Sequence, residues 1–226
     1  TYTEEDLSGR LCYAGLDLST TIDISALILL FPPIKENENY KILCRFWIPQ
    51  DNIQDRVRKD KVPYDVWARQ KHIVTTPGNV IDYSYILKQI DDDAKKFNLR
   101  EIAFDRWGST KIMNDLQNMG FEEETVKHTQ RHLIDFGQGF ASMSAPTKEL
   151  EKLILSKQIA HNNNPVFTWM IIKVAIKQYP GCNVKPDKAA STDRIDGVVA
   201  LIMAVDRASR LNNLNSVYDG RGILTL

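Results

Sequence analysis

Three aspartates stand at the ends of apolar segments, where their carboxylates could meet at one rim of a folded domain. Asp17 closes the apolar run in YAGLDLS, Asp105 closes the run in IAFDRW, and Asp196 lies at the start of the run in DRIDGVVA. Converging carboxylates repel one another, so they either take up protons or bind hard divalent cations through their oxygens. Metal binding is the favoured outcome at neutral pH, and a divalent-metal site is therefore the leading hypothesis.

Such a site depends on two predicted strands being neighbours. If the strands that end at Asp17 and Asp105 are parallel and adjacent, they lie about 4.8 Å apart and hold the two carboxylates at nearly the same height. A helix that begins near Asp196 would then add the third carboxylate. Paired Mg²⁺ or Mn²⁺ ions serve phosphodiester hydrolysis, with one ion activating water and the other stabilising the leaving oxygen. Taken singly, each aspartate could instead be a turn residue or a helix cap.

The elements that must position these residues can be read from the spacing of apolar side chains. Period-two and continuous apolar runs predict strands, and a 3.6-residue period predicts helices. Strands are predicted over residues 11–18, 24–31, 41–48 and 101–104, and helices over residues 64–71, 83–97, 110–119, 146–156, 165–175 and 194–210. The chain thus opens with an antiparallel three-strand meander, and the element order predicts an α/β domain with a mixed sheet flanked by helices.

Composition narrows the class of protein without suggesting its ligand. A chain of 226 residues with 43% hydrophobic residues can bury the core of one large α/β domain. Lys plus Arg and Asp plus Glu number 29 each, so any DNA-binding surface must come from local clustering. Three scattered cysteines predict small buried residues in a reducing compartment, and neither a signal peptide nor a membrane-spanning run is present in the sequence. A cytoplasmic location is expected.

Four long segments resemble, in the same order, the nuclease half of the large terminase subunits of tailed bacteriophages. They are GLDLSTTIDISALILLFP, FDRWGS, QGFASMSAPTKELEKLILSKQIAHNNNPVFTWM and KPDKAASTDRIDGVVALIMAVDRA. The resemblance covers nearly the whole chain, and the collinear order makes it specific. It implies an RNase H-like sheet with helices on both faces, and a two-metal endonuclease that cuts concatemeric double-stranded viral DNA during genome packaging.

The same resemblance implies binding partners and an N-terminal ATPase half. The expected partners are double-stranded DNA, the small terminase subunit and the portal protein, with a homo-oligomeric full-length protein in the host cell cytoplasm and no membrane. Terminase large subunits also carry an N-terminal packaging ATPase, but no G-x-x-x-x-G-K-[ST] phosphate loop occurs in this sequence. Residues 1–226 are therefore expected to form a single nuclease domain.

The resemblance also assigns roles to individual acidic residues. Asp17, Asp105 and Asp196 match the acidic metal-ligand positions of the family, so they are expected to bind two Mg²⁺ or Mn²⁺ ions and to be catalytic. Asp193 precedes Asp196 by three residues, which makes it either a fourth ligand or the N-terminal cap of the last helix. Asp23 lies in a tight turn after the first strand and is assigned to that turn.

Basic residues near these positions are candidates for contacts to DNA phosphates. Lys185, Lys188 and Arg194 flank the proposed metal site, and Arg106 directly follows Asp105. Cations there would hold the scissile strand against the metals, although an ordinary solvated loop has the same composition.

Two loop features are less specific. His161 is either a proton carrier near the metals or a histidine that caps the next helix or is hydrogen-bonded in its loop. Gly137-Gln138-Gly139 is interpreted as a flexible loop that borders a DNA channel.

Two rival functions remain from the sequence. The segment GLDLSTT could be the phosphate loop of an actin-like or sugar-kinase phosphotransferase, but the second glycine-rich loop that this fold needs is missing. Alternatively, the chain could be a non-catalytic module that docks DNA or the portal. The three aspartates argue against that, because mutually repelling carboxylates serve no purpose in a docking module.

Overall fold

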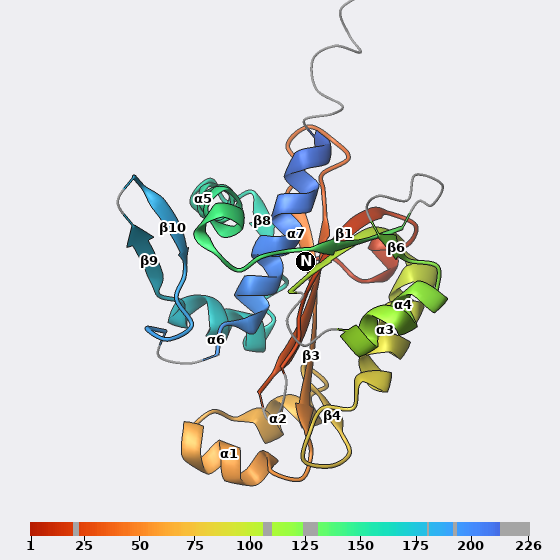
Figure 1. Ribbon diagram of the computed structural model, residues 1–226, viewed down its shortest axis with the longest axis vertical. Helices are drawn as coiled ribbons and strands as arrows, with labels where there is room; N and C mark the ends of the chain where they lie inside the picture. Colours follow the sequence, from red (N-terminus) through yellow and green to blue (C-terminus); the bar gives the residue numbers. More distant parts are fainter. Residues whose placement is uncertain (20–22, 106–109, 124–130, 180, 192–193, 213–226) are drawn as a thin grey trace, which may run out of the picture.

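A central mixed sheet organises the molecule (Figure 1). The computed structural model describes residues 1–226 except 20–22, 106–109, 124–130, 180, 192–193 and 213–226. The first three strands are β1 (Leu11–Asp17), β2 (Ser25–Phe31) and β3 (Tyr40–Pro49), and they pair antiparallel in that order. This pairing confirms the predicted three-strand meander.

Parallel strands extend this meander on both sides. β5 (Asn98–Phe104) pairs with β1, and β7 (His132–Asp135) pairs with β5. The strand order across the sheet is β4-β3-β2-β1-β5-β7-β6. The short outer strands are β4 (Val74–Thr76), β6 (Glu122–Glu123) and β8 (Ile159–Ala160), the last of which pairs with the beginning of β3.

Helices cover both faces of the sheet, which explains why β2 is buried along its whole length. Alternate residues of β2 enter two separate cores, with Ile28 and Leu30 on one side and Leu27 and Leu29 on the other. The first core is closed by α5 (Phe140–Leu155), α6 (Pro165–Lys173) and α7 (Asp196–Asn212). The second is closed by α3 (Tyr83–Lys96) and α4 (Thr110–Asn118).

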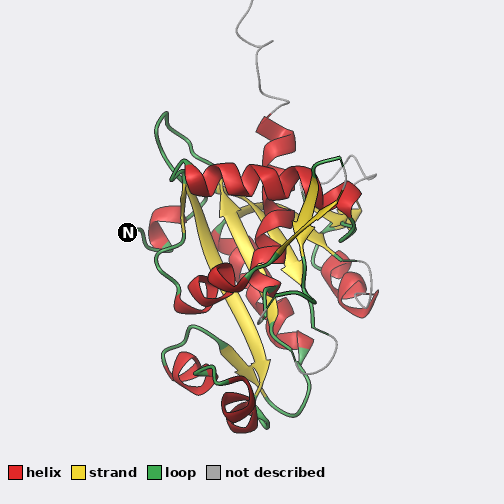
Figure 2. Ribbon diagram, turned by 90° about the vertical axis from the view of Figure 1, so that its left-hand side faces the viewer, coloured by secondary structure: helices red, strands yellow, loops and turns green. Residues whose placement is uncertain are grey.

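Two smaller units lie outside these layers. Helices α1 (Ile53–Asp60) and α2 (Tyr64–Arg69) follow β3 and lie beyond the end of the sheet, which Figure 2 shows from the side of α5 and α6. The strands β9 (Ile176–Tyr179) and β10 (Asn183–Pro186) form a separate antiparallel hairpin beside α5. Cys182, which was expected to be buried, is exposed in the turn of this hairpin.

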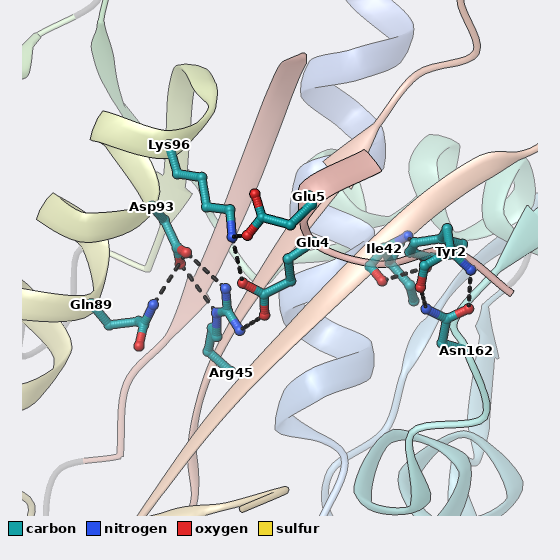
Figure 3. A network of polar contacts seen from close by, with 9 residues as sticks. All are labelled: Tyr2, Glu4, Glu5, Ile42, Arg45, Gln89, Asp93, Lys96 and Asn162. Carbon is teal, nitrogen blue, oxygen red and sulfur yellow. Dashed lines mark hydrogen bonds and ion pairs between the residues drawn. The ribbon is translucent and has the colours of Figure 1, made fainter. Parts of the chain in front are cut away.

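The N-terminal segment is tied to the sheet and to α3 by ion pairs (Figure 3). It includes a short 3₁₀ helix, Glu5–Leu7. Arg45 Nη1 lies 2.6 Å from Glu4 Oε1, and Arg45 Nη2 lies 2.8 Å from Asp93 Oδ1. Lys96 Nζ lies 2.6 Å from Glu5 Oε1. Because Asp93 is buried, this network fixes the segment by neutralising a charge that the fold encloses.

One predicted helix boundary was wrong by more than a turn. The helix predicted over residues 146–156 began at Pro146. The structure starts α5 at Phe140, with Gly139 as its N-cap and Pro146 inside the helix. A proline there removes the one backbone N–H that would donate to Ser142, and burial of Met143 and Leu150 against the sheet offsets this loss.

No helix within the described residues is both long and apolar enough to cross a membrane.

Candidate active site

The carboxyl ends of β1 and β5 bring two of the aspartates to one edge of the sheet. Leu16 pairs with Phe104 in the parallel register of these strands, so Asp17 and Asp105 take the next positions on neighbouring strands. This confirms the strand adjacency on which the metal-site hypothesis depended. Tyr13 belongs to the core beneath α7, and residues two apart in a strand share a face, so Asp17 points toward α7 as well.

Helix α7 brings the third aspartate to the same edge. Asp196 is the first residue of α7, and the helix packs across β1 and β2. Its start lies over the carboxyl end of β1, where Asp17 is 3% exposed. A carboxylate in the first turn of a helix also interacts favourably with the helix dipole.

A lysine ammonium lies between two of these carboxylates. Lys188 Nζ is 2.7 Å from Asp17 Oδ2 and 3.4 Å from Asp196 Oδ1. Lys188 belongs to the connection from β10 to α7, and its side chain is about half exposed. Gln138 Nε2 adds a hydrogen bond of 3.3 Å to Asp17 Oδ1. The site therefore contains a buried pair of carboxylates that is bridged by one positive charge.

Burial makes this pair electrostatically strained. It raises the pKa of Asp17 to about 6, an effect that Lys188 opposes and the charge of Asp196 reinforces. Burial also raises the pKa of Asp196 above its ordinary value, again against the influence of Lys188. Desolvation of the partly buried Lys188 ammonium lowers its pKa, but the two carboxylates outweigh this and raise the pKa above its ordinary value. One monovalent cation thus compensates the pair only in part.

The carboxylate oxygens of Asp17 and Asp196 suit a hard cation, although these two residues alone do not make a complete set of ligands. Asp196 Oδ2 is buried and has no hydrogen-bond partner, which is unusual for a carboxylate oxygen. Among the described residues, however, no group of three or more His, Cys, Asp or Glu side chains is close enough to hold a metal ion. Asp105, directly after β5, is partly exposed. Asp193 and Arg106 lie outside the described residues.

A polar cavity of about 250 Å³ opens beside Asp196. Its charged walls are Asp23, Lys188, Arg194 and Asp196. Arg194 Nη2 lies 2.7 Å from Asp23 Oδ1. The backbone N–H of Asp23 donates to Ser19 Oγ at 2.9 Å, so the turn holds Asp23 in place while its carboxylate faces the cavity. Asp23, which sequence reasoning left out of the site, is thus one of its charged groups.

A second cavity of about 220 Å³ adjoins the first through Lys188. Lys185 lines it, with its Nζ 3.1 Å from the Gln138 carbonyl oxygen and 5.3 Å from the centre of the Phe140 ring. Lys185, Lys188 and Arg194, the proposed phosphate contacts, therefore gather at this edge of the sheet. Gln138 was not recognised as a site residue, although its loop follows β7, a parallel neighbour of β5.

His161 lies at the other end of the sheet. It follows β8, and Ile159 of β8 pairs with Tyr40 at the beginning of β3, whereas the site lies where β3 ends. Its ring packs against that of Phe167 in a tilted arrangement, with 5.5 Å between centroids. Burial lowers the pKa of the His161 imidazole. It is a packed loop residue rather than a proton carrier at the aspartates, and Asn164 is the residue that caps α6.

Sequence comparison relates the chain to large terminase subunits. The family model described as terminase large subunit, endonuclease domain, matches residues 2–211. The large terminase subunit of Enterobacteria phage HK97 is 34% identical over 200 residues, which are 88% of this chain and 38% of that protein. Protein YmfN of Escherichia coli strain K12 is 31% identical over 225 residues, which are 96% of this chain and 47% of that protein. The chain thus spans less than half the length of either relative.

Solved structures show the same relationship. The crystal structure of the HK97 large terminase matches with a TM-score of 0.78 at 34% identity, over 89% of this chain and 40% of that chain. The large terminase nuclease of thermophilic phage G20c matches with a TM-score of 0.55 at 13% identity, over 87% of this chain and 83% of that chain. A structure of the G20c large terminase nuclease with bound magnesium matches with a TM-score of 0.53 at 12% identity, over 91% of this chain and 96% of that chain. The fold is thus the predicted RNase H-like sheet flanked by helices.

Proposed function

This chain belongs to the family of terminase large subunit endonuclease domains, and we propose that it cuts concatemeric double-stranded viral DNA by metal-dependent phosphodiester hydrolysis. The observation that carries the proposal is the buried pair of Asp17 and Asp196 at one edge of the sheet, with an ammonium between them. A fold has little reason to bury two neighbouring carboxylates unless a cation joins them.

We propose that the cations are two Mg²⁺ or Mn²⁺ ions. Asp17 and Asp196 would hold them together with Asp105, and Asp193 remains either a fourth ligand or a cap. Carboxylate oxygens are the ligands that these ions prefer, and a G20c terminase nuclease of similar fold has been solved with bound magnesium. When bound, such ions activate water and stabilise the leaving oxygen.

The chain's own basic and polar residues would then organise the substrate. Gln138 orients the Asp17 carboxylate through its hydrogen bond. Lys188 holds the carboxylates ionised, and an ammonium that is displaced from them becomes available to a DNA phosphate. Lys185, Arg194 and Arg106 are the other proposed phosphate contacts. Phosphate contacts carry no base information, so we expect little sequence preference in the cut.

The wider setting is proposed from family membership. As part of a terminase, the protein would act in the host cell cytoplasm with the small terminase subunit and the portal protein, in a homo-oligomeric motor. Because the chain spans 38% of the HK97 large subunit, these partners concern a longer protein of that kind.

A second candidate function is a non-catalytic module that docks DNA or the portal. The position of Lys188 favours it, because the ammonium fills the space between Asp17 and Asp196 that a metal would use. The two functions differ in DNA cleavage, because a module that docks DNA or the portal does not cut DNA.

Cleavage of supercoiled plasmid tests the proposal directly. We expect nicking and linearisation with Mn²⁺ or Mg²⁺, no cleavage in EDTA, and loss of cleavage in Asp196→Asn. Asp91→Asn is the matched control, because Asp91 lies on α3 and pairs with Lys95 away from the site. Cleavage that persists in EDTA would refute metal dependence, and DNA binding without cleavage in any metal would support the docking module.

The bridging role of Lys188 gives a separate expectation. Lys188→Met leaves Asp17 and Asp196 without their shared cation, so the metal-free domain should melt about 4 °C lower. The increase in melting temperature on adding Mn²⁺ should be larger than in wild type, because no ammonium competes for the carboxylates. Thermal melts with and without Mn²⁺ measure both quantities, with Lys95→Met on α3 as the control. An unchanged metal response would show that Lys188 does not occupy the cation position.

A further inference from the structure

A second charged group near the site is buried without a partner. Arg56 of α1 is 7% exposed, and its Nη1 and Nη2 atoms have no hydrogen-bond partner in the described part of the chain. Buried charges in folded proteins are almost always paired, because water no longer solvates them. An unpaired buried guanidinium therefore indicates an anion that binds it in another state of the protein.

The surroundings of Arg56 compensate its charge only weakly. Its guanidinium carbon lies 5.2 Å from the centre of the Tyr64 ring, a cation–π contact. Burial lowers the pKa of Arg56, and the positive charge of Arg194 adds to this, while Asp23 and Asp60 act in the opposite direction. Asp60 already accepts a hydrogen bond from Tyr64 Oη at 3.1 Å. Arg56 thus lies within the electrostatic reach of the Arg194 and Asp23 ion pair.

That ion pair is accessible to a ligand. The side chains of Arg194 and Asp23 are 38% and 40% exposed, and both line the cavity beside Asp196. An incoming phosphate can therefore compete with Asp23 for the guanidinium of Arg194. The charge of Asp23 acts on Arg56 as well as on Arg194, but only Arg194 is paired with the carboxylate.

We propose that Arg194, Asp23 and Arg56 form a phosphate-binding site for DNA, in which Arg194 leaves Asp23 for a backbone phosphate and Arg56 replaces it on the carboxylate. The inference rests on the proposed function. Without Arg56, transfer of Arg194 to DNA would leave the Asp23 carboxylate unpaired. The charge of that carboxylate would then repel the incoming phosphate. With Arg56, the carboxylate stays neutralised and Arg194 keeps its planar donors for the phosphate.

Arg56→Met tests this exchange, because it removes the charge and keeps an apolar side chain of similar length. We expect binding of a fluorescein-labelled DNA duplex in EDTA, followed by anisotropy, to weaken about tenfold. The melting temperature should not fall, since the variant loses an unpaired buried charge. If the role of Arg56 were purely structural, Arg56→Met would lower both the affinity for DNA and the melting temperature. A loss of thermal stability without a loss of affinity would overturn the proposal. Arg56→Lys, which keeps the charge, should restore much of the affinity.

A double-mutant cycle separates exchange from direct contact. In the Asp23→Asn background, Arg56→Met should leave the Kd for DNA unchanged, because no carboxylate remains to be neutralised. Equal losses in both backgrounds would mean that Arg56 binds phosphate itself, and would overturn the exchange. Arg58→Met is the matched control, since Arg58 lies on the same helix but is exposed and paired with Asp55. We expect less than about a twofold change there.

DNA binding and cleavage by wild type and Arg56→Met distinguish a failure of the proposed function from a failure of the role of Arg56. If the wild-type protein binds no DNA at low salt, the proposed function fails and this site fails with it. If the wild type binds and cuts DNA while Arg56→Met binds equally well, only the role of Arg56 is overturned.

Discussion

Asp17→Asn is expected to raise the melting temperature of the metal-free domain at pH 7.5 by about 9 °C, while abolishing the response to metal and the cleavage of DNA. Burial raises the pKa of Asp17 from 3.8 to about 6, which corresponds to on the order of 3 kcal/mol against the ionised form. Asparagine keeps the shape of the side chain and removes the charge that the fold disfavours. The residue that reduces stability is thus the one that the proposed metal-dependent cleavage requires.

The pH dependence of this effect has a definite sign. Because the folded-state pKa of Asp17 is raised, its contribution to stability is fully present below the unfolded value of 3.8 and is lost as the pH rises through about 6. The difference in melting temperature between Asp17→Asn and wild type should therefore be small at about pH 3.5, reach about half its size near pH 5, and reach its full size above about pH 7. Melts in EDTA across this range measure it.

A matched variant tests whether the effect belongs to the site. Asp93 is also a buried aspartate, but Arg45 binds its carboxylate at 2.8 Å, away from Asp17. Burial raises the pKa of Asp93 as well, against the influence of Arg45, so the metal response is the quantity that separates the two sites. Asp93→Asn should keep the full Mn²⁺-induced increase, which is about 1.4 kcal/mol at ten times the dissociation constant. If Asp17→Asn is instead destabilised and keeps the metal response, Asp17 is a structural residue and the proposed metal site is wrong.

The strands that position the site were predictable because each is a long apolar run with a clear end. Asp17 and Asp105 could be placed side by side from the sequence, since parallel neighbours end at a common edge. The short strands β4, β6, β7 and β8 were not predicted. They have two to four residues each, so their sequences carry too little periodicity to separate them from loops.

The contacts within the site were less predictable than its location. Lys188 was expected to bind phosphate, but in the structure its ammonium lies between Asp17 and Asp196. Gln138 and Asp23 were assigned to a loop and a turn, yet both side chains reach the site. A flexible polar side chain takes the partner that tertiary structure brings near, and local sequence contains no information about a partner 171 residues away.

Glycine 15 shows how the fold sets the distance between the two carboxylates of the site. Gly15 lies two residues before Asp17 on β1 and faces α7. A Cβ atom at Gly15 would lie 1.8 Å from the carbonyl oxygen of Ala200 and 2.7 Å from its carbonyl carbon. The atoms that it meets belong to the helix backbone, which no change of rotamer can move. Only glycine lets α7 lie this close to β1, and α7 carries Asp196.

Gly15→Ala should therefore damage both the fold and the site. The added methyl group must push α7 away from the sheet, which we expect to destabilise the domain by about 3 kcal/mol and to lower its melting temperature by about 10 °C. Because the displaced helix moves Asp196 away from Asp17, Mn²⁺ should also stabilise the variant less than the wild type at temperatures where it stays folded. Gly139→Ala is the control, since no atom lies within 4 Å of a Cβ there and its φ of −81° suits alanine. Calorimetric melts of both variants, with and without Mn²⁺, test this role of Gly15. If Gly15→Ala melts like Gly139→Ala and keeps its metal response, the close approach of α7 to β1 does not position the carboxylates.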